Sequence, residues 1–307
     1  MSTLELGSSS RSAWLLAARP RTLALALASI GMGTFLAAAD GHLNVAVAVL
    51  TFLTAVWLQI LSNLANDYGD SVHGADSAGR LGPPRAVQSG QISAASMRRA
   101  IMLCAALAAV SGLLLLWLAF GRSAWIYLLL FLLLGGLAVG AAVTYTAGDR
   151  PYGYAGLGDL MVFVFFGLVA VVGTYFLQRQ QLAFDVFLPA ASCGFFAVGV
   201  LNVNNIRDLR SDAAAGKRSI PVRIGRQNAR FYHWALLIGG LLCAAGYVLL
   251  NWHSPWQWLF LLAVPLFLRN GLVVWRTEDP VKLDPMLRQL SLSTLAFVLL
   301  FGVGQLL

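Results

Sequence analysis

Eight stretches of this 307-residue chain contain no Lys, Arg, Asp or Glu, and their lengths limit the possible folds more than any other feature. The stretches are 22–39, 43–66, 100–121, 123–148, 160–178, 186–206, 231–268 and 289–307. Most of them match the roughly 20 residues that a helix needs to cross a bilayer. Charged residues make up 11% of the chain and hydrophobic residues 59%, so a soluble fold could not bury the apolar surface.

The longest apolar stretch, 231–268, carries Asn251, Ser254 and Pro255 near its middle. Residues of these types in a cluster indicate a turn, so we expect two helices there. The sequence therefore predicts an all-α polytopic membrane protein. We expect a bundle of about nine transmembrane helices that forms a single domain over residues 1–307.

Lys and Arg residues are distributed unevenly between the two sides of such a bundle. Of the 21 basic residues, 19 fall in segments on the same side as the N-terminus, and only Arg122 and Arg179 fall on the other side. Because basic residues of short loops collect on the cytoplasmic side, we expect a cytoplasmic N-terminus and a C-terminus outside. The same bias accounts for the net charge of +8, which therefore does not indicate a nucleic-acid partner.

The N-terminal segment and the cysteines argue against two other features. Polar residues 1–12 lead into Arg19 and a full-length apolar stretch, which is unlike a cleaved signal peptide. We expect the first span to remain in the mature protein. Cys104, Cys193 and Cys243 lie singly within predicted spans, and this spacing indicates neither disulfides nor a zinc site.

Two predicted cytoplasmic segments, at about 67–97 and 207–230, are much longer than the other connections, and long loops often carry function. Each follows a span that ends in the pattern N-[D/N]-x-x-D. The pattern residues are Asn66, Asp67 and Asp70 after the second span, and Asn204, Asn205 and Asp208 after the sixth. This repetition predicts one catalytic site built from both halves of the chain.

The polar residues of each motif follow steps of three and four. On a helix that runs past the membrane surface, Asn63, either Asn66 or Asp67, and Asp70 would therefore share one face, and Asn205, Asp208 and Asp212 would do the same. Oxygen ligands without a His or Cys cluster favour Mg²⁺, which usually leaves several coordination positions to substrate phosphates. The candidate metal ligands are Asn66, Asp67, Asp70, Asp76, Asp208 and Asp212. We therefore expect a substrate that brings its own phosphates.

Basic and amide side chains are interleaved with these acids. Basic side chains can hold diphosphate oxygens and neutralise charge that develops on a leaving group. The candidate substrate-binding residues are Arg80, Arg85, Lys217, Arg218, Asn63, Asn66, Asn202 and Asn205. The alternative is that the acids are ordinary membrane-surface charges paired with Arg207, Arg210 or Arg218. The number of acids and amides gathered at the span ends favours the functional interpretation.

The motifs resemble those of the UbiA-type intramembrane prenyltransferases, which carry an NDxxD and a DxxxD motif on nine-helix bundles. Here the motifs are Asn66 to Asp70 and Asp208 to Asp212. The strings QILSNLANDYGD, GPPRAVQSG, RPYGYAGLGD and NVNNIRDLRSDAAAGK look closer to the branch that prenylates 1,4-dihydroxy-2-naphthoate in bacterial menaquinone synthesis. This resemblance runs from near residue 19 to near residue 230. The chain departs from many members at Gly74, where they have a further acid, and it has Asp76 instead.

The resemblance implies a Mg²⁺-dependent enzyme of the bacterial cytoplasmic (inner) membrane, with its active site on the cytoplasmic side. Two Mg²⁺ ions would bind the diphosphate of an all-trans polyprenyl diphosphate, and the aromatic ring would attack the allylic cation with loss of CO2 to give demethylmenaquinone. The tail would stay in contact with membrane lipids. Tyr145, a candidate catalytic residue, would orient the acceptor or shield the cation, while Arg150 and Asp159 would bind the acceptor carboxylate and hydroxyls.

Several alternatives stay open on the sequence alone. A related transferase could prenylate 4-hydroxybenzoate, which keeps its carboxylate. A transporter with a cation site between two repeats would need ionisable or helix-breaking residues near mid-membrane, whereas the clustered acids lie at span ends. Tyr145 could be an ordinary interface anchor, and Arg150 and Asp159 could form a loop salt bridge. The sequence carries no signal for donor chain length or oligomeric state.

Overall fold

The fold is a bundle of long helices. The structure, a computed structural model, describes residues 5–72, 86–121, 124–145 and 152–307. Within these ranges there is no strand, and nine segments are long and apolar enough to cross a membrane. They are α2 (Pro20–Ala39), α3 (Val45–Val72), α4 (Ala94–Phe120), α5 (Trp125–Thr144), α6 (Gly158–Val162) with η1 (Phe163–Val172) and α7 (Gly173–Arg179), η2 (Phe184–Val186) with α8 (Phe187–Arg207), α10 (Ile220–Leu250), η3 (Pro255–Ala263) with α11 (Val264–Arg276), and η4 (Pro280–Leu283) with α12 (Asp284–Leu306). For the described residues, the predicted number of spans is confirmed.

The predicted division of the stretch 231–268 is also confirmed. Helix α10 ends at Leu250, and η3 begins at Pro255 after a short turn. The turn is stable because the Ser254 side chain accepts a hydrogen bond from the Trp256 amide, while the Gln257 side chain returns to the backbone of Ser254. This reciprocal cap satisfies amides that a helix start would otherwise leave unpaired.

The structure differs from the sequence prediction around the second motif. A continuous helix was expected to carry Asn205, Asp208 and Asp212 on one face, but α8 ends at Arg207 and a separate short helix, α9 (Leu209–Ala214), follows. Asp208 lies between the two helices with φ −91° and ψ 9°. The predicted loop 207–230 is consequently mostly helical, since α10 begins already at Ile220.

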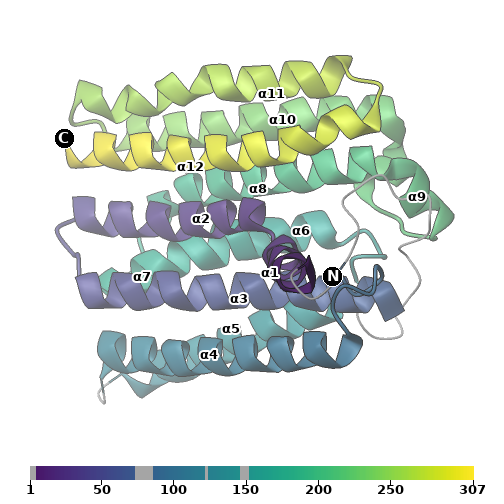
Figure 1. Ribbon diagram of the computed structural model, residues 1–307. Coiled ribbons are helices and arrows are strands. Elements are labelled where there is room, and N and C mark those ends of the chain that lie inside the picture. Colours follow the sequence, from purple (N-terminus) through teal and green to yellow (C-terminus); the bar gives the residue numbers. More distant parts are fainter. Residues whose placement is uncertain (1–4, 73–85, 122–123, 146–151) are drawn as a thin grey trace.

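The first motif lies on a helix, as expected, because α3 continues to Val72 beyond the apolar stretch. An additional helix, α1 (Glu5–Ala18), precedes the first span and was not predicted. It lies across one end of the bundle (Figure 1). Two of its residues, Ala13 and Ala17, are buried against Leu61 and Leu64 of α3.

Packing is uneven between the two halves of the bundle. The largest core lies among α2, η1, α8, α10, α11 and α12 and contains a stack of aromatic rings, including Phe196 against Phe267 with ring centroids 4.3 Å apart. Helices η1 and α8 cross closely at Gly167, where an added Cβ would lie 2.7 Å from the Ala190 oxygen. Small residues at such crossings are typical of membrane bundles. By contrast, α5 has no buried residue, so its outer face is suited to lipid.

The two ends of the bundle differ in character (Figure 1). One end carries α1, α9 and the ends of α3 and α8 where Asp67 and Asp208 lie; we call it the motif end. The C-terminus and the turn between α2 and α3 lie at the opposite end. Both aspartate motifs are thus brought to the same end, although 141 residues separate Asp67 from Asp208 in the sequence.

Candidate active site

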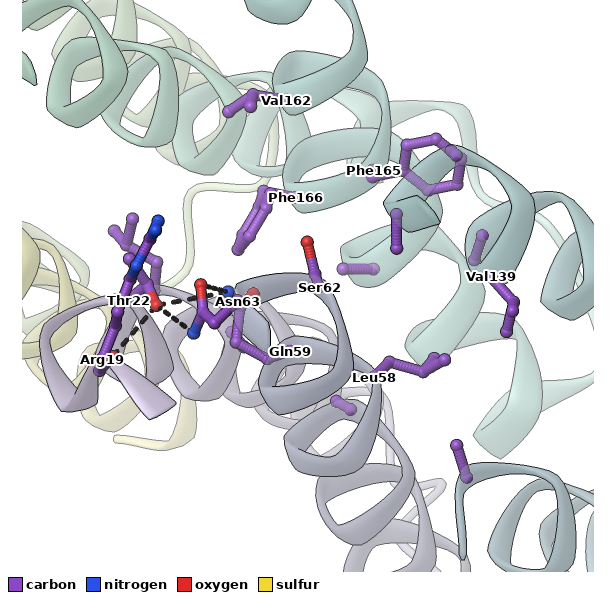
Figure 2. A pocket seen from close by; sticks show the side chains of 18 of the residues that line it. Arg19, Thr22, Leu58, Gln59, Ser62, Asn63, Val139, Val162, Phe165 and Phe166 are labelled. Carbon is purple, nitrogen blue, oxygen red and sulfur yellow. Dashed lines mark hydrogen bonds between the residues drawn. The ribbon is translucent and has the colours of Figure 1, made fainter. Parts of the chain in front are cut away.

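A cavity of about 1370 Å³ extends inward from the motif end between α2, α3, α4, α5 and η1. Its polar lining is concentrated at the motif end and comprises Arg19, Arg21, Gln59, Ser62, Asn63, Asn66, Asp67, Asn204, Lys217, Asp284 and Arg288. Its deeper lining is mostly apolar, with Thr51, Thr54 and Thr174 among it, and reaches Phe131 and Leu177 toward the opposite end. In Figure 2, Val162 and Phe166 face Gln59 and Ser62 of α3 across the space. The cavity therefore suits a molecule with a polar head and a long apolar body.

The first motif contributes Asn66 and Asp67 to the cavity wall. Asp67 is 2% exposed, and one of its carboxylate oxygens accepts a hydrogen bond of 3.2 Å from the Ala86 amide. A buried carboxylate at the end of a membrane span is costly unless it is compensated, which makes it a functional candidate. The side chain of Asp70, together with Asp76, Arg80 and Arg85, lies outside the described residues.

Asn63 lies one turn before Asp67 and is almost completely buried. Its amide nitrogen donates to the Ala18 oxygen and to the Thr22 hydroxyl, each at 2.8 Å, and its oxygen accepts from Gln59 at 3.3 Å. Figure 2 shows this cluster beside the cavity. Arg19, at the bend between α1 and α2, has φ 49°, a left-handed conformation that is unusual for a residue with a side chain. The predicted substrate-binding residue Asn63 thus holds the bend against α3.

The second motif is held by an arginine. The Arg207 guanidinium donates two hydrogen bonds to the carboxylate of Asp208, of 2.8 and 2.7 Å, and a third to the side chain of Asn204. The side chain of Arg207 is fully buried, and that of Asp208 is 6% exposed. The pairing expected from the surface-charge alternative is therefore present, but it is a buried pair beside the cavity rather than an exposed one. Asn204 itself lines the cavity.

Arg207 makes a second ionic contact. Its guanidinium donates to Asp284 at the start of α12, and Asp284 also accepts from Arg21 at 3.1 Å. Asp284 lines the cavity. A row of four side chains with alternating charge thus connects α2, α8 and α12 beside the polar end of the cavity. Its members are Arg21, Asp284, Arg207 and Asp208.

The remaining acid of the second motif, Asp212, pairs with Lys217 at 3.5 Å. The ammonium of Lys217 also lies 6.0 Å from the centre of the Tyr154 ring, and Lys217 lines the cavity. The backbone amide of Arg218 donates to the backbone carbonyl oxygen of Tyr154. The side chain of Arg218 is exposed and does not line the cavity. These contacts dock the segment after α9 onto the turn between α5 and α6.

Tyr145 lines the cavity at the end of α5 and packs edge-on against Tyr152, with ring centroids 5.3 Å apart. The Tyr152 hydroxyl donates to the Ala141 oxygen at 2.8 Å. Burial raises the pKa of Tyr152 above its ordinary value, and the neighbouring Tyr145 adds to this effect. Tyr152 therefore remains protonated and can keep donating this bond, which fixes the aromatic pair at the cavity wall.

Five further predicted residues do not line the cavity: Asp208, Asp212, Asp159, Asn202 and Asn205. Asp159 accepts a hydrogen bond from the Tyr232 hydroxyl at 3.1 Å, and Asn202 donates to the Ala229 oxygen at 3.0 Å. Asn205 is also buried away from the cavity. Arg150 lies outside the described residues. Asn204, rather than Asn202 or Asn205, lines the cavity. In the repeated pattern, Asn204 is equivalent to Asn66.

Sequence reasoning missed Arg21, Asp284 and Arg288 as site residues. The two arginines belong to the 19 basic residues on the predicted cytoplasmic side, where the orientation bias alone accounts for them. Asp284 and Arg288 are four residues apart on α12 and therefore lie on one face, and both line the cavity. That spacing, at the start of the last span, was the available signal.

The donor chemistry of the polar end fits a hard divalent cation. Asn66, Asp67, Asn204 and Asp284 present oxygen atoms around one cavity, and no His or Cys side chain lines it. Within the described ranges, no group of three His, Cys, Asp or Glu side chains is gathered tightly enough to hold a metal by itself. This fits Mg²⁺, which commonly takes one or two protein carboxylates and completes its shell with substrate oxygens and water.

Comparison with known proteins identifies relatives of the whole chain. A sequence model described as the UbiA prenyltransferase family matches residues 24–293. The chain is 49% identical over 292 residues to the 1,4-dihydroxy-2-naphthoate octaprenyltransferase of Escherichia coli (strain K12), covering 95% of this chain and 94% of the relative. It is 38% identical to the protein of the same name from Mycobacterium tuberculosis (strain ATCC 25618 / H37Rv), covering 93% and 94%.

Solved structures share the fold at low sequence identity. A UbiA homolog from Aeropyrum pernix K1 is 17% identical and superposes with a TM-score of 0.69, covering 91% of this chain and 96% of the homolog. A UbiA homolog from Archaeoglobus fulgidus, bound to GPP and Mg²⁺, is 15% identical with a TM-score of 0.61, covering 96% and 99%. The arrangement of spans seen in Figure 1 is thus an established membrane fold.

Proposed function

Because this chain belongs to the UbiA prenyltransferase family, we propose that it transfers a polyprenyl group from an all-trans polyprenyl diphosphate to 1,4-dihydroxy-2-naphthoate. The observation that carries this proposal is a cavity that is polar at the motif end and mostly apolar along its length. A diphosphate and an aromatic acid would occupy the polar end. The isoprenoid tail would lie along the apolar part beside α5.

The wall formed by α5 supports the placement of the tail. Gly135, Gly136 and Val139 line the cavity from this helix, which has no buried residue. A thin wall of small residues between the cavity and lipid allows a long hydrocarbon chain to remain in an apolar environment. The bundle thereby brings a membrane-soluble donor to an acceptor that arrives from water.

We assign the diphosphate and its Mg²⁺ to the polar end. Asn66 and Asp67 would hold metal from the first motif, with Asp208 and Asp212 from the second, and Asp70 and Asp76 remain predicted ligands. Mg²⁺ supplies Lewis-acid neutralisation of the diphosphate when it is bound. Lys217 lies at the cavity surface and would hold a diphosphate oxygen that the metal leaves free.

The reaction would break the allylic C–O bond, with both electrons leaving on pyrophosphate. The ring carbon that bears the carboxylate then forms the new C–C bond, and CO2 departs as the ring regains its aromaticity. The product is demethylmenaquinone in its reduced, hydroquinone form. Tyr145 would shield the allylic cation with its ring face. No protein base is needed to remove a ring proton, which suits a site whose acids are committed to cations.

Acceptor binding needs a cation for the naphthoate carboxylate. Arg150 is the residue predicted for this role from its position in the sequence. Arg19, Arg21 and Arg288 are the basic side chains that line the cavity in the described part of the chain besides Lys217. Asp159 accepts a hydrogen bond from Tyr232, and neither residue lines the cavity, so a contact of Asp159 with the acceptor hydroxyls stays a prediction from the sequence.

We also propose that the protein is a multi-pass component of the bacterial inner membrane, with the motif end in the cytoplasm. A single cysteine is placed at exposed Ser89 in a variant whose three native cysteines have been replaced. It should react with an impermeant maleimide only from the cytoplasmic side. A tag after Leu307 should be accessible only from the periplasmic side. Labelling of both sites from one side would contradict this orientation.

The function is tested by product analysis. Purified protein in nanodiscs is supplied with Mg²⁺, octaprenyl diphosphate and either 1,4-dihydroxy-2-naphthoate or 4-hydroxybenzoate, and the products are identified by mass. Prenylated, decarboxylated naphthalene is expected from the first acceptor. Product from 4-hydroxybenzoate alone would reassign the acceptor, and no product from either would reject the proposal.

A further inference from the structure

The network Arg21–Asp284–Arg207–Asp208 links the polar end of the cavity to the second motif. Arg207 is a fully buried cation that shares its charge between two carboxylates, Asp208 and Asp284. Asp284 in turn shares its charge between two arginines. Asp208 is therefore balanced by the adjacent residue of its own motif, and Asp284 is balanced by arginines on two other helices.

Asp284 and Asp208 share the same arginine, Arg207. A buried guanidinium must be paired with negative charge. If one of its two carboxylate partners is removed, the other carboxylate alone has to neutralise it. With Asp284 in place, Arg207 divides its hydrogen bonds among Asp208, Asn204 and Asp284. Without the charge of Asp284, the net charge of the network becomes more positive by one unit, which raises the potential at Asp208 and opposes the binding of a divalent cation there.

The first motif differs from the second at the position of this arginine. In the repeated pattern, Gly69 occupies the place that corresponds to Arg207. The second motif therefore carries a cation within its own pattern, and a carboxylate from outside the motif offsets the charge of that cation. Asp284 lies at the start of α12, outside both motifs, and supplies that carboxylate.

We propose that Asp284 is a positioning residue that acts through Arg207 to keep the second aspartate motif available to a divalent cation. This inference rests on the proposed function and adds a residue to its machinery. Arg21 has the opposite influence, because it competes with Arg207 for the same Asp284 oxygen.

The test measures Mn²⁺ binding by EPR on purified protein in nanodiscs, with pyrophosphate as the only phosphate present. Asp284→Asn keeps the size and an oxygen acceptor but removes the negative charge, and it should weaken Mn²⁺ binding about tenfold, the effect of one unit charge removed from near the site. In the transfer assay, the Mg²⁺ concentration for half-maximal rate should rise by a similar factor, without an increase in the donor KM.

Asp279→Asn is the matched control. Asp279 is exposed, lies five residues before Asp284, and only caps η4 by accepting from the Val281 amide at 3.0 Å, which Asn can also do. It should leave Mn²⁺ binding unchanged. Equal Mn²⁺ affinity in Asp284→Asn and Asp279→Asn would overturn the proposal.

A second variant keeps the test decisive if Asp284→Asn does not fold. Arg21→Gln removes the competing cation, so Mn²⁺ binding should stay as in the wild type or become tighter. Weaker binding in Arg21→Gln would overturn the proposal. Failure of the wild type to form any prenylated product would reject the proposed function instead, and the Mn²⁺ titrations would still report on the network.

Discussion

The bend between α1 and α2 provides a quantitative test of how the mouth of the cavity is built. Asn63→Ala removes two hydrogen bonds of 2.8 Å, to the Ala18 oxygen and to the Thr22 hydroxyl, and the contact with Gln59. Net hydrogen bonds contribute about 1 kcal/mol each, and a buried group left unpaired costs more. We expect a loss of roughly 2–3 kcal/mol in the free energy of unfolding.

The assay is thermal unfolding of the purified, ligand-free protein in detergent, with the unfolding midpoint followed by tryptophan fluorescence. Gel filtration after heating measures the fraction of protein that remains folded. A loss of this size should lower the unfolding midpoint by roughly 5 °C. The Asn228→Ala variant is the control, because Asn228 is exposed and makes one local bond to the Ile224 oxygen. It should lie within about 1 °C of the wild type.

Coupling between the two sides of the bend sharpens the test. If Asn63 stabilises the bend through Thr22, the cost of Asn63→Ala should be smaller in a Thr22→Val background, by about 1 kcal/mol. An Asn63→Ala midpoint equal to that of Asn228→Ala would refute the reasoning. Strict additivity with Thr22→Val would show that Asn63 acts elsewhere.

Three further predictions concern separate parts of the molecule. Asp67→Asn should abolish turnover at ordinary Mg²⁺ without lowering the unfolding midpoint, and near wild-type turnover would exclude a role as metal ligand. Gly167→Ala should clearly lower the unfolding midpoint, because the added Cβ would lie 2.7 Å from the Ala190 oxygen. An unchanged midpoint would show that η1 and α8 can move apart without loss of stability. Glu278, whose pKa is lowered by its hydrogen bond with Arg230, contributes stability above its unfolded pKa that is lost as pH falls through its folded pKa. Glu278→Gln should therefore lower the midpoint at pH 7 but not at pH 3, and an equal difference at both values would contradict this.

The spans were predictable because bilayer thickness acts on the sequence directly. A charge-free stretch of the right length allows few other folds, and the turn at Ser254 was marked by residues that end helices. The continuation of α3 through Asp67 also followed from the spacing of its polar residues. The break at Asp208 did not, because the steps of three and four persist across it while the helix ends one residue earlier.

Parts of the site depended on contacts between distant segments and could not be read from local pattern. Nothing in the sequence near Asp208 indicates that Asp284, on the last span, reaches Arg207. The roles of Asn63 and Asn202 differ for the same reason. Asn63 donates to the Ala18 oxygen at the bend between α1 and α2, and Asn202 donates to the Ala229 oxygen on α10. Ala18 and Ala229 are both remote in sequence from the asparagines that they bind.

The most direct measurement of the central claim uses 1,4-dihydroxy-2-naphthoate labelled in its carboxyl carbon. The purified protein is incubated with Mg²⁺ and octaprenyl diphosphate, and released labelled CO2 and pyrophosphate are quantified together. We predict a one-to-one ratio of CO2 to pyrophosphate and no label in the prenylated product. Label retained in that product would contradict the decarboxylating transfer, and pyrophosphate release without any prenylated product would contradict transfer to this acceptor altogether.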